Sequence, residues 1–523
     1  MRSPSPQARI EVNLEEIYLI LDAARRQPMS EADYEKVKTA VAALAERAAP
    51  RVRTTEKTRA VLPNQKPDEP AEQEPAAEGE PAKPGHGRNG ASAFTGAHRV
   101  TVAHATLQSG DTCPECRQGR VYRQQKPKTL IRITGQPPLE ATVYEMEQLR
   151  CNGCGQVFTA DPPAQAGEEK YDQSAAAMIA QLRYGSGVPF QRLERLEGNL
   201  GIPLPAATQW ELVEQRAELI RPAFEELIRQ AAQGEVAHND DTGMRILKLA
   251  REPAPEGKPE RTGIFTSGIV SRVGTWFIAL FFSGWKHAGE NLADVLKRRA
   301  PGLPPLIQMC DALSRNTPKL SKGVRLLLAY CLAHGRRQFV EVAANFPEQC
   351  RFVLETLGGV WYHDELARER KLTPEQRLHF HQEHSGPLMN SLKEWMETQL
   401  AEHIIEPNSG LGKAIQYMLR HWTPLTLFLR EASAPLDNNL VERALKKAIL
   451  HRKNSLFYKT MNGAEVGDLF MSLIHTCELN HANPFDYLTE LQRHAEELTQ
   501  NPSAWMPWNY RATLARLATP AAA

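Results

Sequence analysis

After Gln233-Gly234 the hydrophobic pattern of this chain changes, and the change indicates the class of fold that follows. Runs rich in β-branched and aromatic residues, interrupted by turn-forming residues, predict strands at 235–239, 244–249, 263–271 and 275–282. A helix is expected at 290–298, followed by apolar runs at 305–309 and 326–332. Strands that alternate in this way with helices constitute an α/β plan.

The stretch from Pro435 to Thr460 predicts a helix with unusual charge. Asp437 and Asn438 are good N-caps, because their side-chain oxygens can accept the unpaired N–H groups of a first turn. Helical spacing then puts four side chains on one face: Glu442, Lys446, Ile449 and Lys453. A carboxylate can hold a divalent cation, and the neighbouring lysines can meet the phosphates on which that cation works. A solvated basic helix with one Glu–Lys pair remains the alternative.

Length and composition limit the possible classes of protein. With 523 residues, 41% of them hydrophobic, the chain can bury several cores, and about three domains are expected. No run approaches the roughly 20 apolar residues of a membrane span, and the N-terminus lacks an apolar signal core. We therefore expect a cytoplasmic protein. A net charge of +1 excludes a wholly basic nucleic-acid coat but not local basic patches.

Two Cys-x-x-Cys pairs predict a zinc ribbon at 101–165. In a cytoplasmic chain such pairs indicate metal binding rather than a disulfide, and four thiolates make a tetrahedral zinc site. The predicted ligands are Cys113, Cys116, Cys151 and Cys154, with short strands at 120–124, 128–134 and 142–150. Two independent redox or buried thiol pairs are the alternative. The other four cysteines, Cys310, Cys331, Cys350 and Cys477, are expected to be buried thiols.

The segments outside the α/β region are predicted to be helical or extended. Residues 10–50 contain amphipathic helices with a short heptad pattern, which suits either a leucine-zipper-like segment or a docked helical hairpin. Residues 51–100 form a Pro/Glu-rich linker, too polar to offset the entropy of ordering. At 170–232, a helix from Phe190, a Gly-broken turn and a helix from Ala206 suggest a helix-turn-helix, although many helical hairpins look the same. Its candidate DNA contacts are Arg192, Arg195, Gln209 and Arg216.

Several motifs together resemble one family. They are DNNLVERAL and HRKNSLF near the C-terminus, GHGRNGASAFTGA (85–97), the two Cys-x-x-Cys pairs, HNDDTG (238–243), IQMCDALSRN (307–316), CLAHGRRQF (331–339), SLIHTCELNHANPFDYL (472–488) and AWMPWN (504–509). In their order along the chain they resemble the bacterial insertion sequence 66 transposases. The resemblance covers roughly residues 10 to 510.

The resemblance implies a multidomain α/β protein with a ribonuclease H-like catalytic core at 233–460, a helical insertion at about 345–430 and a C-terminal helical domain at 461–510. It implies a catalytic triad of Asp240, Asp311 and Glu442 that holds two Mg²⁺ ions for phosphodiester cleavage and strand transfer. Double-stranded DNA is the implied partner, with self-association on DNA, accessory element-encoded proteins and a place at the nucleoid. The predicted phosphate contacts are Lys446, Arg452, Lys453, Arg336 and Arg337. A ribonuclease H-like nuclease without strand transfer, or a domesticated or accessory DNA-binding protein, is the alternative.

Two motifs depart from the family pattern. The first reads Asp240-Asp241-Thr242 where relatives commonly have Asp-Glu-Thr, so Asp241 is the fallback first ligand. The second reads Cys310-Asp311-Ala312 where many relatives have Asp-Gly-Tyr. Cys331 and His334 have a spacing that permits a metal, but an architectural role is favoured because two ligands do not make a site. A cluster in the insertion, His379, His381 and His384, is expected at the surface.

Overall fold

The computed structural model describes residues 91–93, 99–124, 129–130, 138–150, 152, 154, 156–167, 169–249, 261, 263–320 and 324–518. The predicted N-terminal helical segment, most of the linker and Cys151 lie outside these residues. The described residues of 65–140 belong to one compact unit, and those from 141 onward belong to another.

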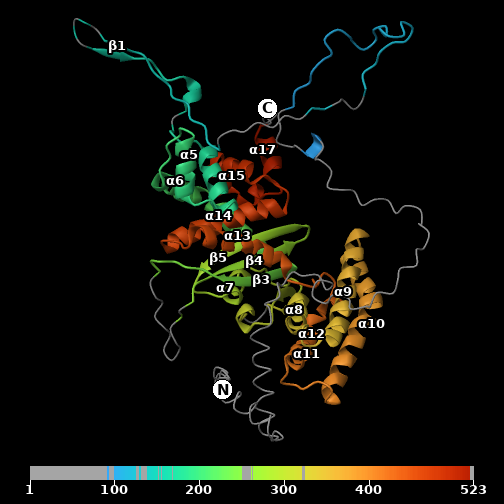
Figure 1. Cartoon of the computed structure of the whole chain (residues 1–523). Helices are drawn as coiled ribbons and strands as arrows, with labels where there is room; N and C mark the ends of the chain where they lie inside the picture. The colour runs from blue at the N-terminus through green and yellow to red at the C-terminus, as the bar shows by residue number, and fades with distance from the viewer. Residues whose placement is uncertain are drawn as a thin grey trace, which may run out of the picture. The chain divides into compact units, whose positions relative to one another are not determined.

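The larger unit is built around a five-stranded mixed sheet (Figure 1). Its strands are β3 (Val236–Gly243), β4 (Phe265–Val273), β5 (Trp276–Gly284), β6 (Leu306–Cys310) and β7 (Leu326–Tyr330). They lie in the order β5-β4-β3-β6-β7; β4 is antiparallel to both of its neighbours, β3 and β5, whereas β6 and β7 run parallel to β3. The α/β prediction is therefore confirmed.

The strand predicted at 244–249 is wrong. These residues form no ladder, and Ile246 makes only an isolated bridge with Tyr458. Instead β3 continues through Asp240 to Gly243. Its pairing with the whole of β4, from Val236 opposite Arg272 to Gly243 opposite Phe265, carries the strand past the point at which its apolar pattern stops.

Helices α7 (Ala288–Leu296) and α13 (Asn439–Ser455) both pack on β3 and β4. Gly268 on β4 explains how closely α13 approaches. A Cβ atom at Gly268 would lie 3.0–3.1 Å from the side chains of Leu445 and Val441, which is tighter than ordinary van der Waals contact. Glycine at this position lets the helix approach the sheet.

Helix α14 (Met461–Leu479) covers the edge strand β5 with a polar stripe. Its side chains repeat every fourth residue and accept the outward N–H groups of alternate β5 residues: Asp468 from Ser283, Ser472 from Phe281, Thr476 from Ala279 and Asn480 from Phe277. The helix thus satisfies backbone donors that an exposed edge would offer to another chain.

Between β7 and α13 the chain is helical. The helices are α8 (Leu332–Val342), α9 (Pro347–Glu369), α10 (Pro374–Ala401), α11 (Gly410–Arg420), α12 (Trp422–Leu425) and the 3₁₀ turn η5 (Leu427–Leu429). Figure 1 shows α9 and α10 side by side, and their buried apolar residues share a core with β6 and β7. His379 and His384 are exposed, but the surface prediction is wrong for His381, which is fully buried between Ser385 and Asp364.

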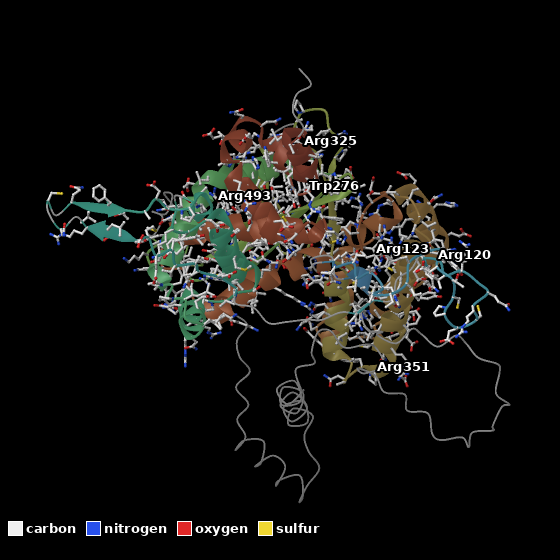
Figure 2. The ribbon with its side chains drawn as sticks, turned by 90° about the horizontal axis from the view of Figure 1, so that it is seen from above. Arg120, Arg123, Trp276, Arg325, Arg351 and Arg493 are labelled. Atoms are coloured by element: carbon white, nitrogen blue, oxygen red, sulfur yellow. The ribbon has the colours of Figure 1, made fainter. Side chains whose placement is uncertain are left out.

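The remaining helices of this unit precede and follow the sheet. They are η2 (Ala164–Ala166), α4 (Gln173–Ala180), the π-helical turn η3 (Gln181–Gly185), α5 (Phe190–Asn199), α6 (Ala206–Ala231), α15 (Pro484–Arg493), α16 (Ala495–Gln500), η6 (Pro502–Trp505) and α17 (Tyr510–Ala518). Helix α6 packs against α14, β4 and β5. Trp276, labelled in Figure 2, stacks on Trp508 with ring centroids 5.5 Å apart and joins the β4–β5 turn to the C-terminal helices.

Each cysteine pair is flanked by short β pairing. Strands β1 (Gln148–Arg150) and β2 (Val157–Thr159) flank 151–154, and a bridge between Thr112 and Arg120 flanks the first pair. The strands predicted at 120–124 and 142–150 are thus largely wrong, since only Arg120 and Gln148–Arg150 pair. The remaining predicted strand, 128–134, lies partly outside the described residues. Within the predicted linker, the structure describes the 3₁₀ turn η1 (Ala91–Ala93).

Candidate active site

Two of the predicted catalytic acids share one hydrogen-bond donor. Asp240 lies within β3, and Asp311 follows the last residue of β6. The side-chain amide of Asn316, in the turn η4 (Ser314–Asn316), donates to Asp311 Oδ1 at 2.5 Å and to Asp240 Oδ1 at 3.2 Å. The structure therefore brings Asp240 and Asp311 together around a buried amide.

The strand register puts both acids on the face of the sheet that α13 covers. Asp240 is the cross-strand partner of Gly268, and such partners point to the same face. The position of a Cβ at Gly268, against Leu445, identifies that face as the one under α13. Asp311 lies two residues after Met309 and therefore points to the same face of the sheet. The partner of Met309 on β3 is His238, which lies two residues before Asp240 and shares its face.

Glu442, the third predicted acid, lies in the first turn of α13. Its carboxylate is 3.9 Å from His334 Nδ1 and belongs to a group with Cys331 and His334 whose ligand atoms all lie within 4.8 Å of one another. Cys331 follows β7, and its N–H donates to the carbonyl of Cys310, the residue before Asp311. Glu442 thus lies at the strand ends from which Asp311 projects.

Asn438 fixes the start of α13 on the sheet. It occupies the N-cap position but makes no side-chain cap bond, contrary to prediction. Its buried amide instead donates to the carbonyl of Asn239 at 3.1 Å, and its Oδ1 lies 3.2 Å from His238 Nδ1. Its N–H donates to Cys331 Sγ at 3.2 Å. The same residue that begins the helix therefore ties it to β3 and to the end of β7.

Asp241 has a different partner and a different face. Its carboxylate lies 2.8 Å from His287 Nδ1, at the N-terminus of α7, and 3.7 Å from Arg315. The side chain is 2% exposed. Because neighbouring side chains of a strand point to opposite faces, Asp241 is directed away from α13. The geometry favours Asp240 over Asp241 as the partner of Asp311.

Burial dominates the electrostatics of these groups. It raises the pKa of Asp240 to about 6, against the hydrogen bond from the Asp241 N–H, and the negative charges of Asp311 and Asp241 add to the rise. Burial also raises the pKa of Cys331 to about 12 and lowers the pKa of His238 to about 4. A cation beside Asp240 would therefore favour the charged form of its carboxyl group.

The predicted phosphate-binding residues divide into two kinds. Lys446 and Lys453 on α13 are exposed, and neither forms an ion pair with another described residue. Arg452 is half-buried and donates to Thr242 Oγ1 at 3.2 Å and to the carbonyl of Gly243, so it holds α13 to the end of β3. Arg336 and Arg337 on α8 are half-buried as well. The two lysines are thus the more accessible of the predicted contacts.

The helices predicted to read DNA are present, but not all of their candidate contacts are accessible. Arg192 and Arg195 on α5 are exposed. Gln209 is fully buried, and its amide donates to the carbonyls of Phe190 and Leu204, so it fixes the turn between α5 and α6. Arg216 is paired with Glu169 at 2.5 Å. The prediction of a DNA contact at Gln209 is therefore wrong.

Backbone N–H groups donate to one thiol of the first cysteine pair. The N–H of Gly119 donates to Cys116 Sγ at 3.4 Å, and backbone donors from Gln118 and Gly119 lower the pKa of Cys116. Cys154 is an exposed free thiol. The remaining four cysteines are buried, as predicted.

Comparison with known proteins decides the family. The model of the family described as "Transposase IS66 family" matches residues 169–466, more than half of the chain, and spans the sheet, the whole of α13 and the start of α14. The chain belongs to the IS66 transposase family. The family expected from the sequence motifs is therefore confirmed.

Three uncharacterized proteins of Sinorhizobium fredii are similar to this chain. It is 35% identical to y4jD over 206 residues, which are 38% of this chain and 39% of y4jD. It is 27% identical to y4hP over 426 residues, 77% of this chain and 74% of that protein. For y4qI the identity is 25% over 346 residues, 64% and 62% of the two chains. Within the described residues, the chain contains no helix long and apolar enough to cross a membrane.

Sequence reasoning missed two residues of this site. Asn316 and His238 both occur in motifs of the family resemblance, but neither carried a predicted role. An asparagine five residues after Asp311, in the same motif, is the signal that could have identified Asn316. His238 needed the tertiary structure, because its partner Asn438 is 200 residues away along the chain.

Proposed function

We propose that this chain is an Asp-Asp-Glu transposase that cuts DNA at the ends of its element and joins the freed 3′-hydroxyl to target DNA. The sheet supports a ribonuclease H-like core, since three antiparallel strands are followed by two parallel ones and a helix carrying the third acid. The observation that carries the proposal is the pair Asp240 and Asp311, from adjacent parallel strands, hydrogen-bonded to one buried amide on the face under α13.

The donor set fits Mg²⁺. Carboxylate and amide oxygens are the ligands that this ion takes, and Asn316 Oδ1 is buried with no hydrogen-bond partner among the described residues. Asp240, Asp311 and Glu442 would hold the ions, which when bound supply activation of the attacking oxygen and stabilisation of the leaving oxygen. Asn316 orients the two aspartates, and Asn438 and Gly268 set the position of α13.

DNA is the proposed partner, held mainly through its phosphates. Lys446 and Lys453 lie on the same helix as Glu442 and offer exposed ammonium groups. A cavity of about 580 Å³ opens where the start of α13 meets α9 and α10. Its charged lining comprises four arginines and two aspartates: Arg272, Arg368, Arg377, Arg443, Asp364 and Asp437. The excess of positive charge beside α13 suits a polyanion. We further propose that the protein self-associates on DNA, acts with accessory element-encoded proteins and is located at the nucleoid.

A structural zinc ion is proposed for the two Cys-x-x-Cys pairs. Cys113, Cys116, Cys151 and Cys154 would supply four thiolates, and the β pairing that flanks each pair supports two knuckles. Metal analysis of the purified chain tests this: about one equivalent of zinc is expected, and a folded sample with less than half an equivalent contradicts it.

The decisive experiment combines binding and chemistry. Labelled element ends are incubated with the protein and Mg²⁺, and DNA binding, cleavage and strand transfer are measured together for Glu442→Gln and the wild type. Because a metal ligand serves chemistry more than affinity, the variant should bind DNA and fail to cut it. Glu478→Gln is the matched control, since Glu478 lies on α14 and pairs with Lys447 of α13 at 2.8 Å. This control should cut normally.

The same assay tests the alternative of an accessory DNA-binding protein. A wild-type protein that binds element ends but neither cuts nor joins them would favour that alternative. A Glu442→Gln variant that cuts normally would show that α13 is only a basic surface.

A further inference from the structure

A second group of metal ligands adjoins the predicted catalytic acids. Cys331 directly follows β7, His334 lies in the first turn of α8, and Glu442 lies in the first turn of α13. One ligand atom from each residue falls within 4.8 Å of the other two. The junction of β7 and α8 and the start of α13, which is distant in the sequence, thus bring a sulfur, an imidazole nitrogen and a carboxylate oxygen to one point.

The chemistry of this donor set differs from that of the aspartate pair. Mg²⁺ prefers six oxygen ligands and rarely takes sulfur, whereas Zn²⁺ and similar transition metals bind thiolate, imidazole and carboxylate in tetrahedral sites. Three protein ligands with a fourth position left for water is a common form of zinc site.

The local hydrogen bonds leave these atoms available. His334 Nδ1 is buried with no hydrogen-bond partner among the described residues, although a buried ring nitrogen normally finds one. Cys331 Sγ accepts a hydrogen bond from the N–H of Asn438, a contact of the kind that orients metal ligands. The 3.9 Å between His334 Nδ1 and Glu442 Oε1 is slightly wider than two ligands of one zinc ion need, so a small side-chain rotation closes the site.

We propose that Cys331, His334 and Glu442 form an inhibitory site for Zn²⁺ or a metal of similar chemistry. Binding releases the thiol proton of Cys331 to solvent and fixes Glu442 beside α8. Glu442 is then unavailable to the Mg²⁺ pair, so the metal stops DNA cleavage. The binding part stands on this geometry alone, and the inhibition rests on the proposed transposase function.

Binding is tested with Co²⁺, whose thiolate complexes absorb in the near ultraviolet. Co²⁺ is titrated into the full-length protein as purified, with its own zinc retained. The expected result is a sulfur-to-cobalt band that saturates at about one equivalent. Cys331→Ala should abolish the band, and His334→Asn should weaken binding at least about tenfold.

Cys350→Ala is the matched control, because Cys350 is also a fully buried thiol but lies on α9. It should leave the band intact, and thermal denaturation of all three variants checks that they are folded. A band that survives in folded Cys331→Ala and His334→Asn arises from other cysteines and overturns the proposal. The absence of any band in the wild type overturns it as well.

Inhibition is tested separately with Zn²⁺ in the cleavage assay. The measured quantity is the ratio of cleavage with and without Zn²⁺ at saturating Mg²⁺. We expect a fall of at least about tenfold for the wild type and little change for His334→Asn. An equal fall in both proteins refutes inhibition through this site. If the wild type binds Co²⁺ at this site but never cleaves DNA, the metal site stands and the transposase proposal fails.

Discussion

Replacing Asn316 with alanine tests the arrangement of the two aspartates. The substitution removes the amide that donates to both Asp240 and Asp311. It leaves the backbone carbonyl of Asn316, which accepts from Gln308 at 2.7 Å and from Asn239 at 2.8 Å. The η4 turn should therefore stay in place while both carboxylates lose a partner.

The size of the effect follows from these contacts. Asp240 Oδ1 keeps the N–H of Asp241 and Asp311 Oδ1 keeps the N–H of Leu313, so each acid retains one donor. Loss of a residue that orients metal ligands typically costs about 10–100-fold in metal affinity, or roughly 1.4–2.7 kcal/mol. The half-saturating Mg²⁺ concentration for cleavage should rise by that factor. High Mg²⁺ should restore most of the rate.

The assay is a Mg²⁺ titration of cleavage at a fixed concentration of labelled element end. Asn480→Ala is the control, because Asn480 is likewise an inward-facing amide but holds α14 to Phe277 of β5. Both variants should lose about 1–3 kcal/mol of stability, but only Asn316→Ala should change the Mg²⁺ dependence. An unchanged half-saturating concentration, or an equal change in both variants, would refute the role assigned to Asn316.

Three further predictions concern stability and DNA binding. Burial raises the pKa of Asp468 to about 7, above the unfolded value, so its contribution to stability is complete below about pH 4 and is lost as the pH rises through 7. Asp468→Asn should remove this pH-dependent loss of stability, which is roughly 4 kcal/mol. Unfolding free energies of the wild type and the variant that change in parallel with pH would contradict this prediction. Gly268→Ala should cost about 1–3 kcal/mol of folding stability and reduce cleavage, because the new methyl group meets α13. Gly358→Ala, with open space around its Cβ, should be neutral or slightly stabilising, and equal stabilities of the two variants would argue against close packing at Gly268. Lys446→Ala and Lys453→Ala should each weaken binding to every DNA sequence alike and lower the salt slope by roughly one, and a loss confined to one sequence would indicate base contacts instead.

Much of the secondary structure could be predicted from local patterns. The sequence indicates β4, β5, β6 and α7 within a few residues, because burial on a sheet or a helix imposes its own period on apolar residues. The prediction failed at 244–249, where β-branched and apolar residues form no ladder, since strand formation requires a partner that the sequence pattern does not reveal. It also failed at His381, whose burial depends on Asp364 of the neighbouring helix.

The sequence by itself determined the α/β class, the two cysteine pairs and, through its colinear motifs, the membership in the transposase family. The tertiary structure alone decided which side chains meet. The register of β3 against β4 directs Asp240 towards α13 and Asp241 towards His287, although the two residues are adjacent in the chain. The parallel pairing of β3 with β6 brings Asp311 to the same amide as Asp240. Such pairings depend on contacts between residues far apart in sequence, and a one-residue change of register would reverse every face.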